Sequence, residues 1–291
     1  VNGDTEASLE TGVIVSRAAG ENVGSYTITP SSASSSNYTV SFETSEFGIT
    51  AAGLTVAAID QTKVYGATDP TLTYAITGFV NGDTEASLET GVIVSRAVGE
   101  NVGSHTITPS SASSSNYTVS FETSEFGITA AGLIVVAIDQ TKVYGTTDPT
   151  LTHSITGFVN GDTEENLDTK VNISRVAGEN VGNYTITPYG AADSNYAISF
   201  VTADFSITAA SITVKGLTGV NKVYDGTTNA TASGIPVLSG AVSGDDLVLE
   251  GTPVFTFESA ELATDIQITT TGFIITGTDS ENYILIQPTL S

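Results

Sequence analysis

The chain has 291 residues, no cysteine, methionine or tryptophan, and a formal net charge of −24 from 32 acidic and 8 basic residues. Without cysteine it forms neither disulfide bonds nor thiolate metal sites. The negative charge repels nucleic acids and anionic membranes, and no apolar run approaches the roughly 20 residues of a membrane span. We therefore expect no nucleic-acid partner and no membrane insertion, and cations are the natural small partners.

The chain is a tandem array. Residues 1–54 recur as residues 80–133, at an offset of 80 − 1 = 79, with differences only at Ala19/Val98 and Tyr26/His105. A third, more diverged copy begins at Val159, again 79 residues later. Such a period predicts small domains, each able to fold alone. We expect four units: 1–54, a partial repeat that lacks its first strands; 55–133; 134–210; and 211–291, which lacks its last strand.

One full unit reads as short strands between turns. The expected strands are residues 54–59, 72–77, 92–96, 105–108, 117–121 and 126–129. Residues 60–70 read as a turn-bearing stretch, and residues 83–88 as a single helical turn capped by Asp83 or Thr84. This pattern predicts an all-β fold, a small sandwich or barrel.

The segment Val-Gly-x-Tyr-Thr-Ile-Thr, at residues 23–29 and 181–187, is similar to the tyrosine corner of immunoglobulin-like sandwiches. The second copy carries His105 in place of the tyrosine. The favoured fold is therefore a tandem array of Ig-like β-sandwich repeats, and the alternative is a β-grasp-like sheet with one short helix. Because Ala-Ala-Gly at 130–132 is the whole linker between two units, we expect a rod-like array.

Several motifs resemble known repeat families. Tyr-Gly-x-x-Asp-Pro recurs at residues 65–70 and 144–149, together with Gly-Phe-x-Asn-Gly-Asp and Gly-Glu-Asn-Val-Gly-x-Tyr-x-Ile-Thr. These resemble the MBG repeats of bacterial surface proteins, and Lys-Val-Tyr-Asp-Gly-Thr-Thr at 222–228 resembles the companion YDG repeat. The resemblance covers nearly the whole chain. It implies the extended stalk of an extracellular or cell-surface adhesin or secreted fibrous protein, with no catalytic residues.

The residues themselves also argue against an enzyme. Histidine is the commonest catalytic base, and the chain has two. His105 stands where the sister units have tyrosine, and His153 stands where Tyr74 does. A residue that exchanges with tyrosine fills a packing position, and no Ser/His/Asp set recurs.

Carboxylates in turns are weak candidates for calcium ligands, since calcium prefers several oxygen ligands and can stiffen a junction. Two lie beside a unit junction, Asp60 and Asp139, and four lie in turns: Asp83, Asp162, Asp245 and Asp246. The favoured interpretation is a solvated acidic surface, with no cofactor.

Lysines 63, 142 and 222 recur at one place, which predicts a salt bridge or a packed lysine stem, with an isopeptide cross-link as the less favoured alternative. The function that we favour is a stalk or fibre segment whose partners are neighbouring repeats of the same or a longer chain. One alternative is a subunit that self-assembles into filaments by strand complementation of the incomplete terminal repeats. Another is a carbohydrate-binding or ice-binding module, because Thr-x-Thr pairs recur along the expected strands.

Overall fold

The computed structural model describes residues 3–291, and its strands fall into four groups, which we name repeats 1 to 4. The chain divides into two compact units, Val1–Ala131 with repeats 1 and 2, and Gly132–Ser291 with repeats 3 and 4. Across residues 3–291 the only helices are single 3-10 turns: η1 (Glu6–Ser8), η2 (Glu85–Ser87), η3 (Glu164–Asn166) and η4 (Ser280–Asn282). None of them is long or apolar enough to cross a membrane. The protein is therefore an all-β tandem array, as the sequence predicts.

Repeat 1 is one antiparallel sheet in the order β1-β2-β3. Its strands are β1 (Ile14–Arg17), β2 (Gly24–Ser31) and β3 (Ser45–Ile49). Residues 38–43, which have the same sequence as a strand of repeat 2, form no strand here.

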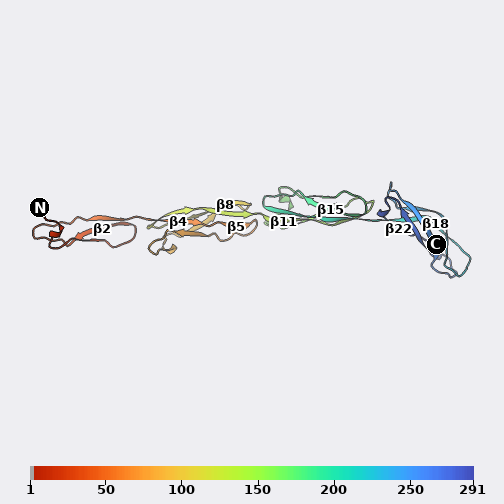
Figure 1. Ribbon diagram of the computed structural model, residues 1–291, viewed down its shortest axis with the longest axis horizontal. Coiled ribbons are helices and arrows are strands. Elements are labelled where there is room, and N and C mark those ends of the chain that lie inside the picture. Colours follow the sequence, from red (N-terminus) through yellow and green to blue (C-terminus); the bar gives the residue numbers. More distant parts are fainter. Residues whose placement is uncertain (1–2) are drawn as a thin grey trace. The chain divides into compact units, whose positions relative to one another are not determined.

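Repeat 2 is a sandwich of two sheets, in which Figure 1 labels β4, β5 and β8. One sheet has the order β6-β4-β9, from β6 (Tyr74–Thr77), β4 (Ala52–Ala58) and β9 (Tyr117–Glu122). The other has the order β5-β10-β8-β7, from β5 (Gln61–Val64), β10 (Ser124–Thr129), β8 (Gly103–Ser110) and β7 (Ile93–Arg96). Only residues 50 and 51 separate β3 from β4.

Two of the strand pairs in repeat 2 are parallel. β4 pairs with β9 in the first sheet, with Leu54 opposite Val119. β5 pairs with β10 in the second, with Lys63 opposite Ile128. The chain therefore enters the repeat through β4 and β5 and leaves it through β9 and β10, and the entering strands run beside the leaving strands.

The strand β5 corrects a sequence prediction, because residues 60–70 read as turn. Its four residues, Gln-Thr-Lys-Val, include one strongly apolar side chain, so the local pattern gives little strand signal. The strand forms because β10 supplies a parallel hydrogen-bonding edge, and its lysine is held by distant acidic residues. A complete repeat thus has seven strands, from β4 to β10, where the sequence predicts about six.

The predicted helical turn at residues 83–88 is confirmed as η2 (Glu85–Ser87). Thr84 is its N-cap, and the Thr84 and Ser87 side chains form a capping box. Before it, Asn81 and Gly82 have φ angles of 55° and 80°. An Asn-Gly pair suits two successive left-handed residues, so this turn is encoded locally.

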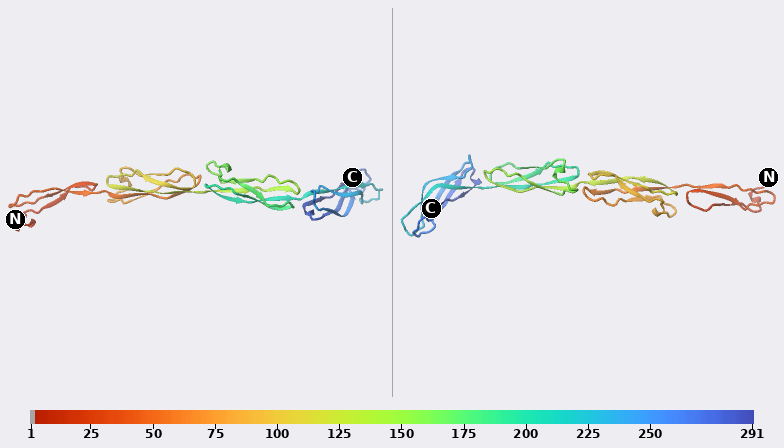
Figure 2. Two further views of the ribbon diagram at one scale, coloured as in Figure 1. Left: turned by 90° about the horizontal axis from the view of Figure 1, so that it is seen from above. Right: turned by 180° about the vertical axis from the view of Figure 1, so that it is seen from behind.

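Repeat 3, in the second unit, has the same two sheets, and Figure 2 shows the strands from two further sides. The sheet β13-β11-β16 is built from β13 (His153–Thr156), β11 (Ala131–Ala137) and β16 (Tyr196–Val201). The sheet β12-β17-β15-β14 is built from β12 (Gln140–Val143), β17 (Ala203–Thr208), β15 (Gly182–Tyr189) and β14 (Asn172–Arg175). The sheets pack through a core that joins Ala137 of β11 to Ile186, Phe205 and Ile207 of the second sheet.

Repeat 4 has two sheets of three strands. One has the order β19-β18-β22, from β19 (Thr231–Ser239), β18 (Ala210–Val220) and β22 (Tyr283–Ile286). The other has the order β20-β21-β23, from β20 (Val248–Phe257), β21 (Ile268–Thr276) and β23 (Thr289–Leu290). As in repeat 2, where β4 pairs with β9, the first strand pairs in parallel with a late one, here β18 with β22.

Candidate functional site

A network of four charged side chains closes one end of the four-stranded sheet of repeat 2. The Lys63 side chain, from β5, is 4% exposed. Its Nζ donates to Asp69 Oδ1 at 2.7 Å and to a carboxylate oxygen of Glu100. Arg96, from β7, donates from Nε to Asp69 Oδ2 at 2.5 Å and from Nη2 to Glu100 Oε1 at 2.5 Å. Because β5 and β7 are the two edges of this sheet, the network ties its edges together.

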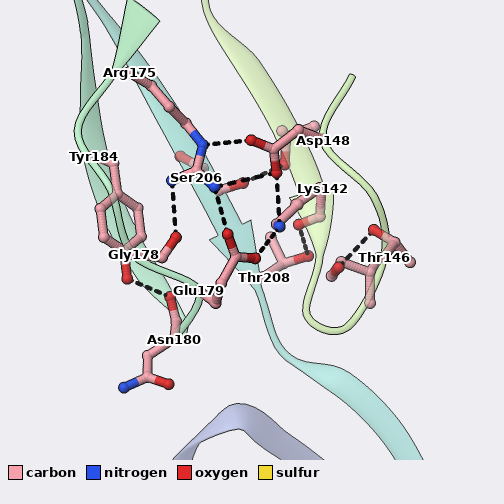
Figure 3. A network of polar contacts seen from close by, with 12 residues as sticks. Lys142, Thr146, Asp148, Arg175, Gly178, Glu179, Asn180, Tyr184, Ser206 and Thr208 are labelled. Atoms are coloured by element: carbon pink, nitrogen blue, oxygen red, sulfur yellow. Dashed lines mark hydrogen bonds and ion pairs between the residues drawn. The ribbon is translucent and has the colours of Figure 1, made fainter. Parts of the chain in front are cut away.

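Repeat 3 carries the same network, which Figure 3 shows from close by. Asp148 lies between Arg175 and Lys142, at 2.6 Å from Nε of the arginine and 2.7 Å from Nζ of the lysine. Glu179 contacts both cations from the other side. The guanidinium of Arg175 also lies over the ring of Phe205, 4.6 Å from its centroid. Because Phe205 belongs to the core, the network covers one side of that core.

The electrostatics of the network oppose covalent cross-linking. Hydrogen bonds from Arg96 and then Lys63 lower the pKa of Asp69 to about 2. Hydrogen bonding to Asp69 and Glu100 raises the pKa of Lys63. An isopeptide bond to an asparagine beside an acid requires a neutral amine, and one to an aspartate also requires a protonated carboxyl; the arrangement disfavours both of these forms. The predicted salt bridge at lysines 63 and 142 is therefore what the geometry supports.

The third recurring lysine, Lys222, lies in a different setting. It bonds to Asp225 Oδ1 at 2.8 Å and to the carbonyl of Thr227 at 2.7 Å, and its side chain is 27% exposed. Its partners lie within five positions in the sequence, so this contact holds a local turn.

A tyrosine and an aspartate fasten one turn in every repeat. In repeat 2 the Tyr117 hydroxyl donates to Asp83 Oδ2 at 2.8 Å and accepts from the backbone N–H of Val80 at 3.1 Å. The equivalent pairs are Tyr38 with Asp4, Tyr196 with Asp162, and Tyr283 with Asp245. In repeats 2 to 4 the aspartate of the Asn-Gly-Asp or Ser-Gly-Asp turn thus receives a phenol, and in repeat 1 Asp4 receives one.

Three of the six aspartates that the sequence offered as candidate calcium ligands therefore accept a tyrosine hydroxyl: Asp83, Asp162 and Asp245. The other three accept different hydrogen bonds. Asp60 and Asp139 accept the backbone N–H groups of Glu125 and Asp204 at 2.8 and 2.9 Å, and Asp246 accepts from Thr278. Within residues 3–291 no three acidic or histidine side chains gather where they could hold a metal ion. Calcium binding stays a prediction, and the geometry gives it no support.

The tyrosine-corner hypothesis is supported by hydrogen bonds in three repeats. Tyr26 and Tyr184 each donate to the carbonyl four residues earlier, that of Asn22 at 2.7 Å and that of Asn180 at 2.8 Å. His105 lies 3.0 Å from the equivalent carbonyl, that of Asn101. Here Gly178 is required, because its φ is 156° and a Cβ would lie 2.1 Å from the Tyr184 ring. The histidine therefore replaces tyrosine in a structural role.

The other histidine also follows its tyrosine counterpart. His153 Nε2 lies 3.2 Å from Glu164 Oε2, and the hydroxyl of Tyr74 donates to the equivalent Glu85. Both pairs hold a 3-10 turn to the strand that precedes it, β6 or β13. The contacts of both histidines fit the predicted packing role, and neither is to a hydroxyl nucleophile.

Contacts between neighbouring repeats are a feature that the sequence did not predict. In the second unit, the Tyr144 hydroxyl of repeat 3 donates to Asp245 Oδ2 of repeat 4 at 2.9 Å. Its ring meets Tyr283 edge-on, with centroids 5.3 Å apart. Burial, followed by the hydrogen bond to Asp245, raises the pKa of Tyr144 to about 12. A second contact joins η4 to the turn that precedes β15, where the N–H of Val181 donates to Asn282 Oδ1. The only sequence signal is that the same tyrosine, asparagine and aspartate positions recur.

Comparison with known families agrees with these features. The model of the MBG domain (YGX type) matches residues 1–48, 54–127 and 133–206, which is more than half of the chain. The chain belongs to the MBG family. Its three MBG matches are followed by a match to the YDG domain at residues 208–290. The resemblance seen in the sequence motifs is thus confirmed, and the family matches follow the repeats.

Other comparisons add little. No curated protein matches the chain. A solved structure of three N-terminal domains of the Highly Immunogenic Outer Capsid protein of bacteriophage RB49 aligns over 95% of this chain and 98% of that one. It shares 14% sequence identity, with a TM-score of 0.30. Similarity at this level carries no functional argument.

Proposed function

We propose that these MBG and YDG repeats form a load-bearing stalk segment of an extracellular bacterial surface protein, one that holds a binding tip away from the cell. One observation carries the mechanical part of this proposal. In repeats 2 and 3, the strands by which the chain enters the repeat pair in parallel with the strands by which it leaves. This arrangement determines how tension along the chain loads the hydrogen bonds.

Tension pulls β5 toward the N-terminus and β10 toward the C-terminus. Because the two strands are parallel, the pull slides them along each other, and the hydrogen bonds between them are loaded together. In an antiparallel hairpin pulled from its open end, the bonds would instead break one at a time. Shear of this kind raises the barrier to forced unfolding, which is the quantity that matters for a stalk under load.

The ionic network reinforces the same strands. Lys63 lies on β5, the entering edge strand, and its carboxylate partners are both held by Arg96 of β7. The arginine in turn lies 4.8 Å from the ring centroid of Phe126, on the leaving strand β10. Sliding of β5 against β10 therefore pulls the buried Lys63 away from Glu100, in addition to breaking backbone hydrogen bonds.

The composition supports a surface location. A net charge of −24 keeps near-identical neighbouring domains soluble and discourages association of their sheet edges. The absence of cysteine means that the ionic network takes the place that disulfides hold in many small extracellular domains. The partners that we propose are neighbouring repeats of the same or a longer chain. We propose no nucleic-acid or membrane partner and no catalytic activity.

Single-molecule pulling of the full chain from its two ends tests the proposal. Repeats 2 and 3 should rupture in separate events, each releasing about 3.5 Å per residue of the repeat. Their rupture force should exceed that of repeat 1, which has no parallel pair within residues 3–291. The variant Asp69→Asn should lower the force of one event and leave the other unchanged. Rupture of all repeats at the same low force would remove the mechanical role.

A second candidate function is supported by one feature of repeat 1. The edge of β3 has no parallel partner in the described chain, and Phe47 on it is 44% exposed. An earlier segment of a longer chain would cover this edge, as β5 covers β10, and a strand from another copy would do so in a self-assembling filament subunit. Light scattering over a range of concentrations distinguishes the two: growth with concentration supports assembly, and a constant monomer mass excludes it.

A further inference from the structure

The same pair of hydrogen bonds joins neighbouring repeats in both units. In the first unit the backbone N–H of Val23 donates to Asn116 Oδ1 at 2.9 Å, and Asn116 Nδ2 donates to Asn22 Oδ1 at 3.1 Å. One asparagine side chain of repeat 2 thus serves as acceptor and donor for an Asn-Val dipeptide in repeat 1.

In the second unit the same residue types make the same contact at other positions. The N–H of Val181 donates to Asn282 Oδ1 at 2.8 Å, and Asn282 Nδ2 donates to Asn180 Oδ1 at 3.3 Å. The receiving repeat here is the YDG domain, whereas in the first unit it is an MBG domain. The contact is therefore shared by two families of repeat.

The chemistry of the contact selects asparagine. An amide offers one acceptor and one donor on the same planar group, and both are used. Aspartate would keep the acceptor and lose the donor, and a hydrophobic residue would lose both. The receiving asparagine also stands directly before the tyrosine that binds the turn aspartate, as Asn116 before Tyr117 and Asn282 before Tyr283. The hydrogen bond between that tyrosine and the aspartate thus fixes the position of the asparagine within its own repeat.

We propose that this Asn-Val turn is a coupling surface that recognises the next repeat by its Asn-Tyr pair, whether that repeat is MBG or YDG. The turn lies between β1 and β2 in repeat 1 and between β14 and β15 in repeat 3. Because of these hydrogen bonds, the protection of the turn's backbone N–H from solvent depends on an asparagine side chain of the following repeat. It is independent of the mechanical role, because it concerns neighbour recognition at rest.

Amide hydrogen exchange of the full chain, resolved to single residues by NMR, tests the coupling. The variant Asn116→Ala removes both hydrogen bonds to repeat 1 without opening a core, since Asn116 is half-buried. The amide of Val23 should then exchange about tenfold faster or more, because its acceptor is lost. Asn282→Ala should have the same effect on Val181, and neither variant should affect the other unit.

Two further variants sharpen the test. Asn282→Asp keeps the acceptor for Val181 and should leave most of its protection, which separates loss of the contact from unfolding of repeat 4. Asn37→Ala is the matched control, because Asn37 stands in an identical Ser-Asn-Tyr sequence and its side chain has no hydrogen bond to another repeat in the described chain. The proposal is overturned if Val23 and Val181 keep their protection while exchange rises only in the substituted repeat.

Discussion

Phe47 and Phe126 hold the same position in two identical segments, yet the first is 44% exposed and the second is fully buried. The difference arises from the strands around them. β10 has β5 on one side and β8 on the other, whereas β3 has β2 alone. Identical sequence therefore produces a core residue only where the sheet is completed by a segment from earlier in the chain.

Phe126→Ala should cost repeat 2 about 3–5 kcal/mol, the usual loss for a fully buried phenylalanine. Phe47→Ala is its matched control and should cost repeat 1 less than about 1 kcal/mol, because the ring is half in water. Amide exchange in β8 and β2 under mild denaturant reports the two repeats separately. Equal losses would contradict the burial difference.

Acid should weaken repeats 2 and 3 through their ionic networks. The pKa of Asp69 and that of Asp148 lie at about 2, below the ordinary 3.8, because arginine and lysine hydrogen bonds favour the charged form. A lowered pKa in the folded state contributes stability above about pH 4, and this contribution is lost as the pH falls toward 2. Urea midpoints between pH 6 and pH 2 measure it.

Asp69→Asn should lower the stability of repeat 2 at neutral pH and flatten its dependence on pH in the acid range. Glu122→Gln removes a charge from an exposed position of the same repeat and serves as control. If Asp69→Asn leaves the loss of repeat 2 stability between pH 6 and pH 2 unchanged, the ionic network does not cause that loss.

The intact mass of the protein should equal that of its sequence. An isopeptide bond from Lys63 or Lys142 to an asparagine would release one ammonia, and a bond from either lysine to the carboxyl of Asp69 or Asp148 would release one water. Arginine keeps both carboxylates ionised, which removes the leaving group that amide formation needs. A mass lower by one or two molecules of ammonia or water, located by fragmentation to Lys63 or Lys142, would show the opposite.

His105→Tyr should change the stability of repeat 2 by less than about 0.5 kcal/mol, because the imidazole already contacts the Asn101 carbonyl that the phenol would bond to. The variant restores the phenol that bonds to the carbonyl four residues earlier in repeats 1 and 3. Tyr184→Phe removes the hydrogen bond to the Asn180 carbonyl and should cost repeat 3 about 0.5–1.5 kcal/mol. Exchange of the amides in β8 and β15 measures both changes, and a destabilising His105→Tyr would mean that the imidazole has a role of its own.

Calcium at millimolar concentration should give no saturable heat on titration into the full chain. The aspartates that the sequence pointed to already accept phenol or backbone donors, and they do not gather in the described chain. Saturable uptake that is abolished by Asp83→Asn or Asp162→Asn would reinstate the calcium site.

Local patterns predicted much of this fold. Alternation located most strands, Asn81 and Gly82 marked a left-handed turn, and Thr84 marked the cap of η2. The tyrosine corner was also visible, because its hydrogen bond spans only four residues. Each of these signals resides in neighbouring residues, which a sequence pattern can report.

What the sequence did not reveal depends on distant partners. The strand β5 exists because β10 lies beside it, 65 residues later in the chain (126 − 61 = 65). The ionic network joins Lys63 to Glu100, and the contact between repeats joins Asn22 to Asn116. No local period encodes such pairings. The recurrence of lysines 63 and 142 was the one hint of the network, and it indicated a position without naming the partners.

The two contacts between repeats have a consequence for how the gene can change. Both use an Asn-Val dipeptide on one side and an asparagine before tyrosine on the other, and in the three MBG repeats these residues recur in phase with the 79-residue period. Unequal crossing-over between nearly identical copies adds or removes whole periods. Each such event preserves the residues of this contact, so array length can vary among descendants by whole repeats without the design of a new interface.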